Sequence, residues 1–513
     1  MLSTVYSAGL FGIDGFPVTV EVDARQNLPA FELVGLPDMA VKEAKERVRT
    51  ACENSGLRFP EVALMINLAP ADRRKEGSGF DLAILTGILH AVGVIRRDVS
   101  LDDSCFIGEL SLSGKLRSVR GVLCMCAAAR EAGFGKVYVP MENAAEAAAV
   151  RGINVYGVES MSALLDHLNG RKTLAPMSTS ETVSDDEAYV GLDFADVRGQ
   201  SMAKRALEIA AAGGHNVLLI GPPGTGKSML AKRLPSILPP LTFEEALTTT
   251  KIHSVSGILP EGQALVMRRP FRSPHHTMSA VSLVGGGANP TPGEISLAHN
   301  GVLFLDELPE FPKQVTDALR QPLEDLKVTI TRASGRVTFP SAFMLVAAMN
   351  PCRCGYFGHP TRKCTCRAGD VARYLSNVSG PMLDRMDIQI ELPSLTFEEI
   401  SADEPNVETS ATIRARVTAA RAFARARMEA EGDVPRCNAQ LDPAGVHRYC
   451  RATDGALALL KQAYEALGLS ARGHDRILRV ARTVADLDAS EHIREEHIAQ
   501  AIQLRSLDRK YWH

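Results

Sequence analysis

The chain has 513 residues, of which 45% are hydrophobic and 23% charged, the composition of an ordinary globular protein. This length exceeds what one hydrophobic core organises, so we expect two or three domains. The net charge of −3 excludes a protein that is basic throughout, and any nucleic-acid binding must come from local basic surface. The sequence has neither a run of about 18 apolar residues nor a secretory signal pattern, which predicts a cytoplasmic protein without membrane contact.

The first 172 residues alternate strand-like and helix-like segments. Strands are predicted at 18–22, 64–68, 104–113 and 136–140, and helices at 40–52, 82–92 and 124–132. Residues 173–192 are polar, poor in bulky apolar side chains and acidic towards their end. This pattern predicts an α/β domain over 1–172, followed by a linker over 173–192.

A second α/β domain is predicted over 193–395 and a helical C-terminal domain over 396–513. In the second domain, a helix at 202–212 precedes an apolar strand at 216–220, which leads into a glycine-rich loop. The residues after 396 contain amphipathic stretches that are rich in arginine, leucine and alanine.

The glycine-rich loop fits the phosphate-binding pattern G-x-x-x-x-G-K-[ST]. Its residues are Gly221, Pro222, Pro223, Gly224, Thr225, Gly226, Lys227 and Ser228. An apolar strand precedes it and a helix is predicted after it, which is the context that the motif requires. Glycines allow the backbone N–H groups to surround phosphates. We therefore expect ATP here, with Lys227 at the β- and γ-phosphates and Ser228 on Mg²⁺.

An apolar strand predicted at 301–307 ends in two acids. We expect Asp306 to hold Mg²⁺ through water and Glu307 to polarise the attacking water. An acid pair at a strand end is moderate evidence alone, and its combination with the glycine-rich loop predicts an ATP hydrolase.

A further apolar strand, at 344–350, ends in Asn350. Here the sequence resembles the AAA+ ATPases, in which the matching residue senses the γ-phosphate. The segment 380–387 resembles the stretch that carries the arginine finger of the magnesium-chelatase and minichromosome-maintenance branch, which assigns that role to Arg385. The segment 470–479 resembles its sensor-2 helix, with Arg472 as the matching arginine and Arg476 as the second choice. The alternatives are a turn-forming asparagine and ordinary surface arginines.

Longer strings narrow the resemblance to the magnesium-chelatase-like ComM/YifB proteins of bacteria. These strings lie at 271–277, 285–287, 292–311 and 350–356. The resemblance implies an ATP-driven homo-hexameric DNA helicase that promotes branch migration during natural transformation and homologous recombination. Its AAA+ core would carry a C-terminal helical lid.

Two basic segments are candidates for DNA contact. The stretches 327–332 and 336–339 alternate polar and apolar residues, which predicts a β-hairpin with Arg332 and Arg336 beside its tip. In this AAA+ branch such a hairpin projects into the ring pore. The segment 268–276, which includes Arg272, resembles the helix-2 insert that forms a second pore loop. Arginines that are merely solvated, or a metal site at the two adjacent histidines, are the alternatives.

Four cysteines gather on the loop 352–366. They form two C-x-C pairs, Cys352 with Cys354 and Cys364 with Cys366. Four thiolates favour a tetrahedral structural Zn²⁺. Reduced thiols or a redox pair are the alternatives.

The segments 107–121 and 137–143 are similar to the Lon protease domain. Lon proteases use a Ser–Lys dyad, whereas this chain has Gly79 and Leu123 at the two matching positions, with Ser78 one residue away. The resemblance therefore implies a Lon-like domain that is inactive as a peptidase and serves ring assembly or DNA contact.

Two other function classes stay open. One is a magnesium-chelatase-type motor that remodels protein partners. The N-terminal domain, the linker and the cysteine loop argue against it, because the chelatase motor subunit lacks them. The other is a nucleotide-gated scaffold, against which Glu307 weighs.

Overall fold

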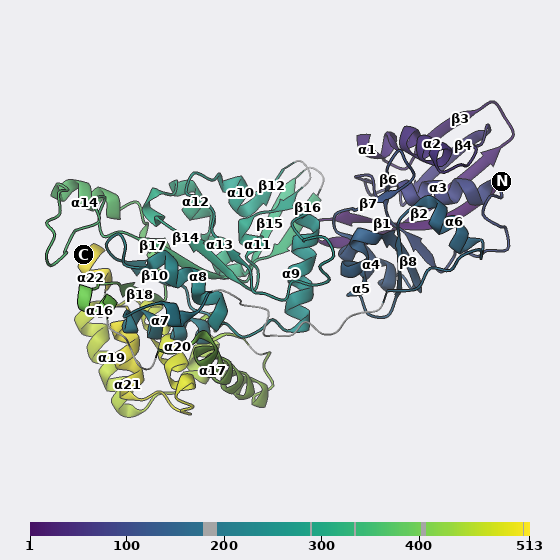
Figure 1. Ribbon diagram of the computed structural model, residues 1–513. Helices are drawn as coiled ribbons and strands as arrows, with labels where there is room; N and C mark the ends of the chain where they lie inside the picture. Colours follow the sequence, from purple (N-terminus) through teal and green to yellow (C-terminus); the bar gives the residue numbers. More distant parts are fainter. Residues whose placement is uncertain are drawn as a thin grey trace.

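The computed structural model describes residues 1–177, 192–287, 290–332, 335–401, 407–434, 436–505 and 507–512 (Figure 1). Most of the predicted linker, residues 178–191, lies outside the described residues. Within the described ranges, no helix is both long enough and apolar enough to cross a membrane.

The N-terminal part is built on a seven-stranded mixed sheet with the order β3-β4-β2-β1-β5-β8-β9. Its strands are β1 (Leu2–Phe11), β2 (Asp14–Arg25), β3 (Ala30–Val34), β4 (Ala63–Ala69), β5 (Ser104–Phe106), β8 (Lys136–Pro140) and β9 (Asn154–Val158). Its helices are α1 (Met39–Lys42), α2 (Ala44–Asn54), α3 (Asp81–Ala91), α4 (Val122–Glu131), α5 (Ala144–Ala148) and α6 (Met161–Leu168). Helix α3 is apolar on all sides, and this explains why it is buried over nearly its whole length.

The strand predicted over 104–113 is wrong in its second half. The sheet strand β5 ends at Phe106, and a separate two-stranded sheet pairs β6 (Glu109–Leu110) with β7 (Leu116–Arg117). The chain leaves the main sheet because Gly108 bonds elsewhere: its N–H donates to Gly79 and its carbonyl accepts from Leu82 at the start of α3.

The second part is built on a five-stranded parallel sheet with the order β11-β14-β17-β10-β18. Its strands are β10 (Val217–Ile220), β11 (Phe271–Arg272), β14 (Val302–Leu305), β17 (Met344–Met349) and β18 (Ile388–Glu391). Side chains of β10, β14 and β17 alternate between two buried hydrophobic clusters, one on each face of the sheet. Burial on both faces explains why these strands are continuous apolar runs.

Helices cover this sheet and two small hairpins extend from it. The helices are α7 (Ser201–Gly213), α8 (Lys227–Ile237), α9 (Phe243–Ser256), α10 (Ala280–Val284), α11 (Glu294–Leu297), α12 (Lys313–Ala318), α13 (Arg320–Asp325), α14 (Ala368–Leu375) and α15 (Gly380–Leu383). The hairpins are β12 (Gly285–Gly286) with β13 (Thr291–Pro292), and β15 (Lys327–Arg332) with β16 (Gly335–Pro340). The hairpin predicted at 327–339 is therefore confirmed.

The expectation for residues 268–276 needs correction. Phe271 and Arg272 form the edge strand β11 of the core sheet, paired in parallel with Val302 and Leu303 of β14. The elements that project from the core at this point are α10, β12 and β13, which follow in sequence. The place of β11 is decided by its pairing with residues 31 positions later in the chain, and the local composition of 268–276 does not indicate that pairing.

The C-terminal part is helical, as expected. Its helices are α16 (Phe397–Ser401), α17 (Ser410–Ala430), α18 (Pro443–Tyr449), α19 (Asp454–Leu467), α20 (Ala471–Leu487), α21 (Glu495–Gln503) and α22 (Leu507–Trp512). Helices α17 and α20 share one hydrophobic cluster with α7 of the core. Helix α22 returns to the core, where the Tyr511 hydroxyl donates to Glu391 of β18 at 2.8 Å.

Among the described residues, the N-terminal part contacts the core through α4, through Arg151, whose guanidinium lies 4.5 Å from the centre of the Phe243 ring, and through the tip of the β1–β2 hairpin (Figure 1). Helix α4 packs against α9, and there the Ser254 hydroxyl donates to the carboxylate of Glu146 at 2.6 Å. The tip of the β1–β2 hairpin touches the β15–β16 hairpin. A Cβ on Gly335 would lie 2.8 Å from the Phe11 ring, and a Cβ on Gly12 would overlap Val337.

Candidate nucleotide site and cysteine cluster

The loop 221–226 connects β10 to α8 and curls around a buried lysine. Gly224 and Gly226 adopt φ angles of 82° and 89°, which only glycine adopts without strain. Lys227 begins α8, and its ammonium donates to the carbonyls of Gly221 and Pro222 at 2.7 and 2.8 Å. Burial lowers the pKa of Lys227 to about 8, and Asp306 opposes that shift. The loop thus holds a desolvated cation against two backbone carbonyls, and it is this cation that suits an anionic ligand.

The ends of β10, β14 and β17 bring the predicted polar side chains together, because parallel neighbouring strands end at the same edge. The Ser228 hydroxyl donates to the Asp306 carboxylate at 2.6 Å. The Lys227 ammonium donates to the amide oxygen of Asn350 at 3.1 Å. A hydroxyl beside a carboxylate is the oxygen donor set that Mg²⁺ prefers, so these residues fit the expected ion.

Glu307 projects away from these contacts. Its backbone has φ 54° and ψ 47°, a left-handed conformation that is uncommon for a residue with a Cβ. Its carboxylate is half exposed and lies 3.5 Å from Nδ1 of His276. His276 comes from the turn after β11, and its ring contacts that of His275 with centroids 4.1 Å apart. No local pattern in the chain predicts that His276 and Glu307 meet.

Arg385 and Arg472 line a different cavity, of about 410 Å³, between the core and the C-terminal helices. Arg476 and Arg479 of α20 also line it, whereas no residue of the loop 221–228 is among its described lining. The guanidinium of Arg385 pairs with Glu324 at 2.5 Å and donates to the carbonyls of Arg320 and Pro381. Within one chain, the two arginines therefore lie apart from the glycine-rich loop.

The three arginines predicted to contact DNA have different surroundings. Arg332 and Arg336 are exposed at the end of the β15–β16 hairpin. The Arg332 side chain also approaches the carbonyl of Gly287 at 3.4 Å, so the two projecting hairpins meet there. Arg272 instead forms a bidentate pair with Glu294 at 2.6 and 2.7 Å.

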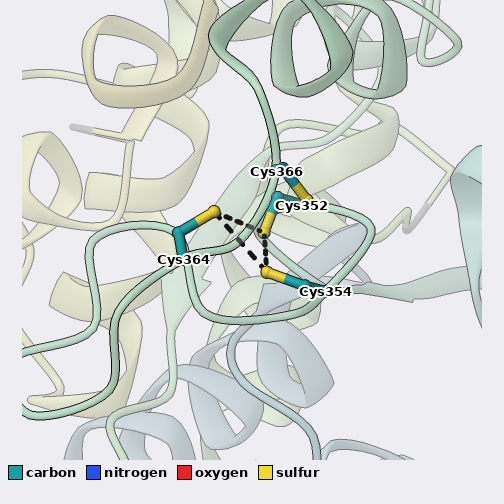
Figure 2. Close-up of side chains that lie close together, drawn as sticks. All are labelled: Cys352, Cys354, Cys364 and Cys366. Carbon is teal, nitrogen blue, oxygen red and sulfur yellow. Dashed lines mark hydrogen bonds between the residues drawn. The ribbon is translucent and has the colours of Figure 1, made fainter.

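The four predicted cysteines converge on one point (Figure 2). The sulfur of Cys352 lies 3.3 Å from that of Cys354 and 3.7 Å from that of Cys364, and Cys354 and Cys364 are 3.5 Å apart. All four sulfurs, with Cys366, lie within 4.8 Å of one another. Tetrahedral ligation with bonds of about 2.3 Å places sulfurs about 3.8 Å apart, so the cluster fits one zinc-sized ion.

The pKa directions within the cluster differ: the pKa values of Cys352, Cys364 and Cys366 are raised, with burial as the largest cause at Cys352, and only the pKa of Cys354 is lowered. The N–H groups of Phe357 and Tyr356 bond to the Cys352 sulfur. Burial raises the pKa of the Cys354 thiol, but bonds from the N–H groups of Thr365 and Tyr356 outweigh burial and lower it to about 5. A thiolate is the form that ligates a metal ion.

The cysteine loop touches the glycine-rich loop directly. Gly355 has φ 84°, and a Cβ built on it would lie 2.7 Å from Cγ of Pro223. Cys352, the first cysteine of the loop, also lies only two residues after Asn350. The thiol cluster is therefore linked to the phosphate pocket by chain continuity and by packing.

We predicted from the sequence that Gly79 and Leu123 replace the Ser–Lys dyad of Lon proteases, and both residues are buried in the N-terminal domain. Leu123 is fully buried in α4, and Gly79 is buried at the start of α3. The Ser78 hydroxyl donates to the carboxylate of Glu109.

The parallel core sheet and the side chains at its strand ends define a P-loop protein of the AAA+ class. Three profiles match the chain: "Magnesium chelatase, subunit ChlI" at 193–400, "Subunit ChlI of Mg-chelatase" at 20–143, and "Magnesium chelatase, subunit ChlI C-terminal" at 407–505. YifB of Escherichia coli (strain K12) is 41% identical over 512 residues, covering 100% of this chain and 98% of YifB. Competence protein ComM of Haemophilus influenzae is 42% identical over 515 residues, covering 99% of this chain and 98% of ComM.

The chain belongs to the magnesium-chelatase-like ComM/YifB family of AAA+ proteins. A more distant similarity links it to the maternal DNA replication licensing factor mcm6 of Xenopus tropicalis. That similarity is 22% identity over 310 residues, which cover 57% of this chain and 32% of mcm6.

Proposed function

We propose that the chain is an ATP-hydrolysing ring motor, a DNA helicase that promotes branch migration in natural transformation and homologous recombination. The residues of the loop 221–228 would hold the phosphates of ATP, and Ser228 and Asp306 would hold Mg²⁺, which neutralises phosphate charge when bound. Glu307 would activate the attacking water, and Asn350 would help to orient it. The contacts of Ser228 with Asp306 and of Lys227 with Asn350 support one shared pocket.

The single observation that carries the ring is the separation of Arg385 and Arg472 from their own glycine-rich loop. Arginines needed for hydrolysis but placed in another cavity can complete the site of an adjacent subunit. A head-to-tail contact of this kind closes into a ring, and we propose a hexamer. Before assembly, Glu324 would hold Arg385 in its own subunit.

The DNA role rests on the β15–β16 hairpin, whose exposed Arg332 and Arg336 offer cations for sequence-independent phosphate contacts. The names of two relatives, a competence protein and a DNA replication licensing factor, point in the same direction. The N-terminal domain, which we propose to be Lon-like without peptidase activity, would support ring assembly or DNA contact.

ATPase measurements with and without single-stranded DNA test this function. We expect DNA to stimulate turnover several-fold in the full chain, and the Arg332→Ala, Arg336→Ala double variant to lose most of that stimulation while it still binds ATP. The Arg448→Ala, Arg494→Ala double variant, which removes two exposed arginines of the C-terminal part, is the matched control. Turnover that responds to a protoporphyrin and magnesium-chelatase partner subunits, and not to DNA, would instead favour the chelatase-type motor that the family profiles name.

We also propose that Cys352, Cys354, Cys364 and Cys366 hold one structural Zn²⁺. The Cys364→Ser variant should lose the ion, and because Gly355 supports Pro223, we expect it to bind ATP about five- to tenfold more weakly, a loss of about 1 kcal/mol. Metal analysis and titration with a fluorescent ATP analogue measure the two effects. The Cys437→Ser variant, outside the cluster, should change neither. Loss of the ion with unchanged ATP affinity would contradict the link between the two loops.

A further inference from the structure

We propose that the cysteine loop, residues 351–367, is a second binding surface for single-stranded nucleic acid, separate from the β15–β16 hairpin. This inference rests on the DNA-motor function proposed above and adds a contact site to it. Its evidence is the charge of the loop, its aromatic side chains, its rigid attachment and its place in the molecule.

The loop is strongly cationic. It contains four exposed cations and no aspartate or glutamate: Arg353, Arg362, Lys363 and Arg367. Four thiolates around one divalent ion carry a net charge of about −2, so the surface keeps about two positive charges when the metal is bound. The chain as a whole has a net charge of −3, which makes this stretch a local exception. Phosphates are the ligands that such a surface attracts.

Aromatic rings stand among these cations. Phe357 is 39% exposed, so its ring is accessible from solvent. The guanidinium of Arg362 lies 5.2 Å from the centre of the Tyr356 ring and donates to its hydroxyl at 2.8 Å. Unpaired bases stack on aromatic rings and on guanidinium planes, whereas paired bases cannot reach them. An acidic peptide could pair with the cations of the loop, but it would not stack on the aromatic rings. The combination of cations and aromatic rings therefore favours single-stranded nucleic acid.

The loop is held firmly enough to present these groups. The sulfur cluster fixes its two ends, and the His359 ring meets the Ser394 hydroxyl at 3.0 Å beyond β18. Gly355 packs against Pro223 of the phosphate pocket. A nucleic-acid strand bound to the cysteine loop would therefore lie close to the proposed ATP site, and it would not need to contact the β15–β16 hairpin.

The two surfaces lie at opposite ends of the core. In Figure 1, β16 lies beside the N-terminal sheet, while α14, which follows the cysteine loop directly, lies at the far end of the core. The stretch of DNA that contacts the β15–β16 hairpin cannot also contact the cysteine loop of the same chain. The loop thus suits a second stretch of DNA, such as the strand that a helicase separates from its partner.

Fluorescence anisotropy with a labelled oligothymidylate, on the full chain with a non-hydrolysable ATP analogue, tests the inference. The Arg353→Glu, Lys363→Glu double variant and the Phe357→Ala variant should each bind at least about fivefold more weakly. For the double variant, the slope of log K against log salt should fall by about 1.4, the value for two lost single-strand phosphate contacts. Zinc content of one ion per chain in each variant shows that the loop is folded.

Two comparisons make the result decisive. The Lys461→Glu, Arg494→Glu double variant carries the same charge change at exposed sites of the C-terminal part, and it should keep the affinity of the unmodified chain. Loop variants that hold zinc and match this control in affinity and in salt slope would overturn the inference. If the hairpin variant alone loses DNA, the motor function stands and the loop site falls. If the unmodified chain binds no DNA, both fall. If polyglutamate displaces the oligothymidylate equally well from the unmodified chain and from the Phe357→Ala variant, the loop would instead be a site for an acidic protein.

Discussion

Replacing Glu307 by glutamine is expected to reduce ATP turnover by about 10²- to 10⁴-fold while ATP still binds. Glutamine keeps the size of the side chain but cannot accept a proton from the attacking water. The contacts that would hold the nucleotide, from Lys227, Ser228, Asp306 and Asn350, do not involve the Glu307 carboxylate. Steady-state phosphate release measures turnover, and titration with a fluorescent ATP analogue measures binding.

Glu310→Gln provides the matched control, because it makes the same chemical change at an exposed acid three residues further on. That variant should retain turnover close to the unmodified value. Normal turnover in Glu307→Gln would show that another group activates the water, and the residue to examine next would be Asp306.

Replacing Arg385 by alanine is expected to lower turnover by about 10³-fold or more, the contribution of an arginine that stabilises charge on the transferring phosphoryl group. ATP affinity should change less, since Arg385 lies outside the cavity of its own glycine-rich loop. The Lys227→Ala variant should be inactive for a different reason, because it lacks the cation of the phosphate pocket.

Mixing the two inactive variants tests whether the site is shared. In randomly mixed rings, about a quarter of the interfaces pair an intact Lys227 with an intact Arg385 of the neighbour, so turnover should recover to about that fraction. The control mixes Lys227→Ala with Arg373→Ala, an arginine of α14 that is 83% exposed; the Arg373 variant should be active alone. No recovery in the first mixture would place Arg385 outside the neighbour's site.

The sequence was sufficient to predict which polar side chains the core sheet brings together at one edge. The loop 221–228, the acid pair after β14 and Asn350 after β17 each follow an apolar strand, and parallel pairing then brings them to one edge. The spacing of the cysteines likewise predicted their convergence.

Features that depend on contacts between residues far apart in the chain could not be predicted from local sequence patterns. The edge strand β11 is too short to show a period, and its place is set by β14. The contact of His276 with Glu307 and the ion pair of Glu324 with Arg385 join residues 31 and 61 positions apart. The contact of Gly355 with Pro223 needs a left-handed backbone angle that no composition rule supplies.

The contact between the two β-hairpins has a mechanical consequence. Phe11 and Gly12 at the tip of the β1–β2 hairpin press on Gly335 and Val337, while α4 holds α9 at a second point. Two separated points of attachment resist rotation as well as sliding. If the β15–β16 hairpin moves, these contacts would make the N-terminal sheet move with it, and force applied to the hairpin would be shared between the two parts of the chain.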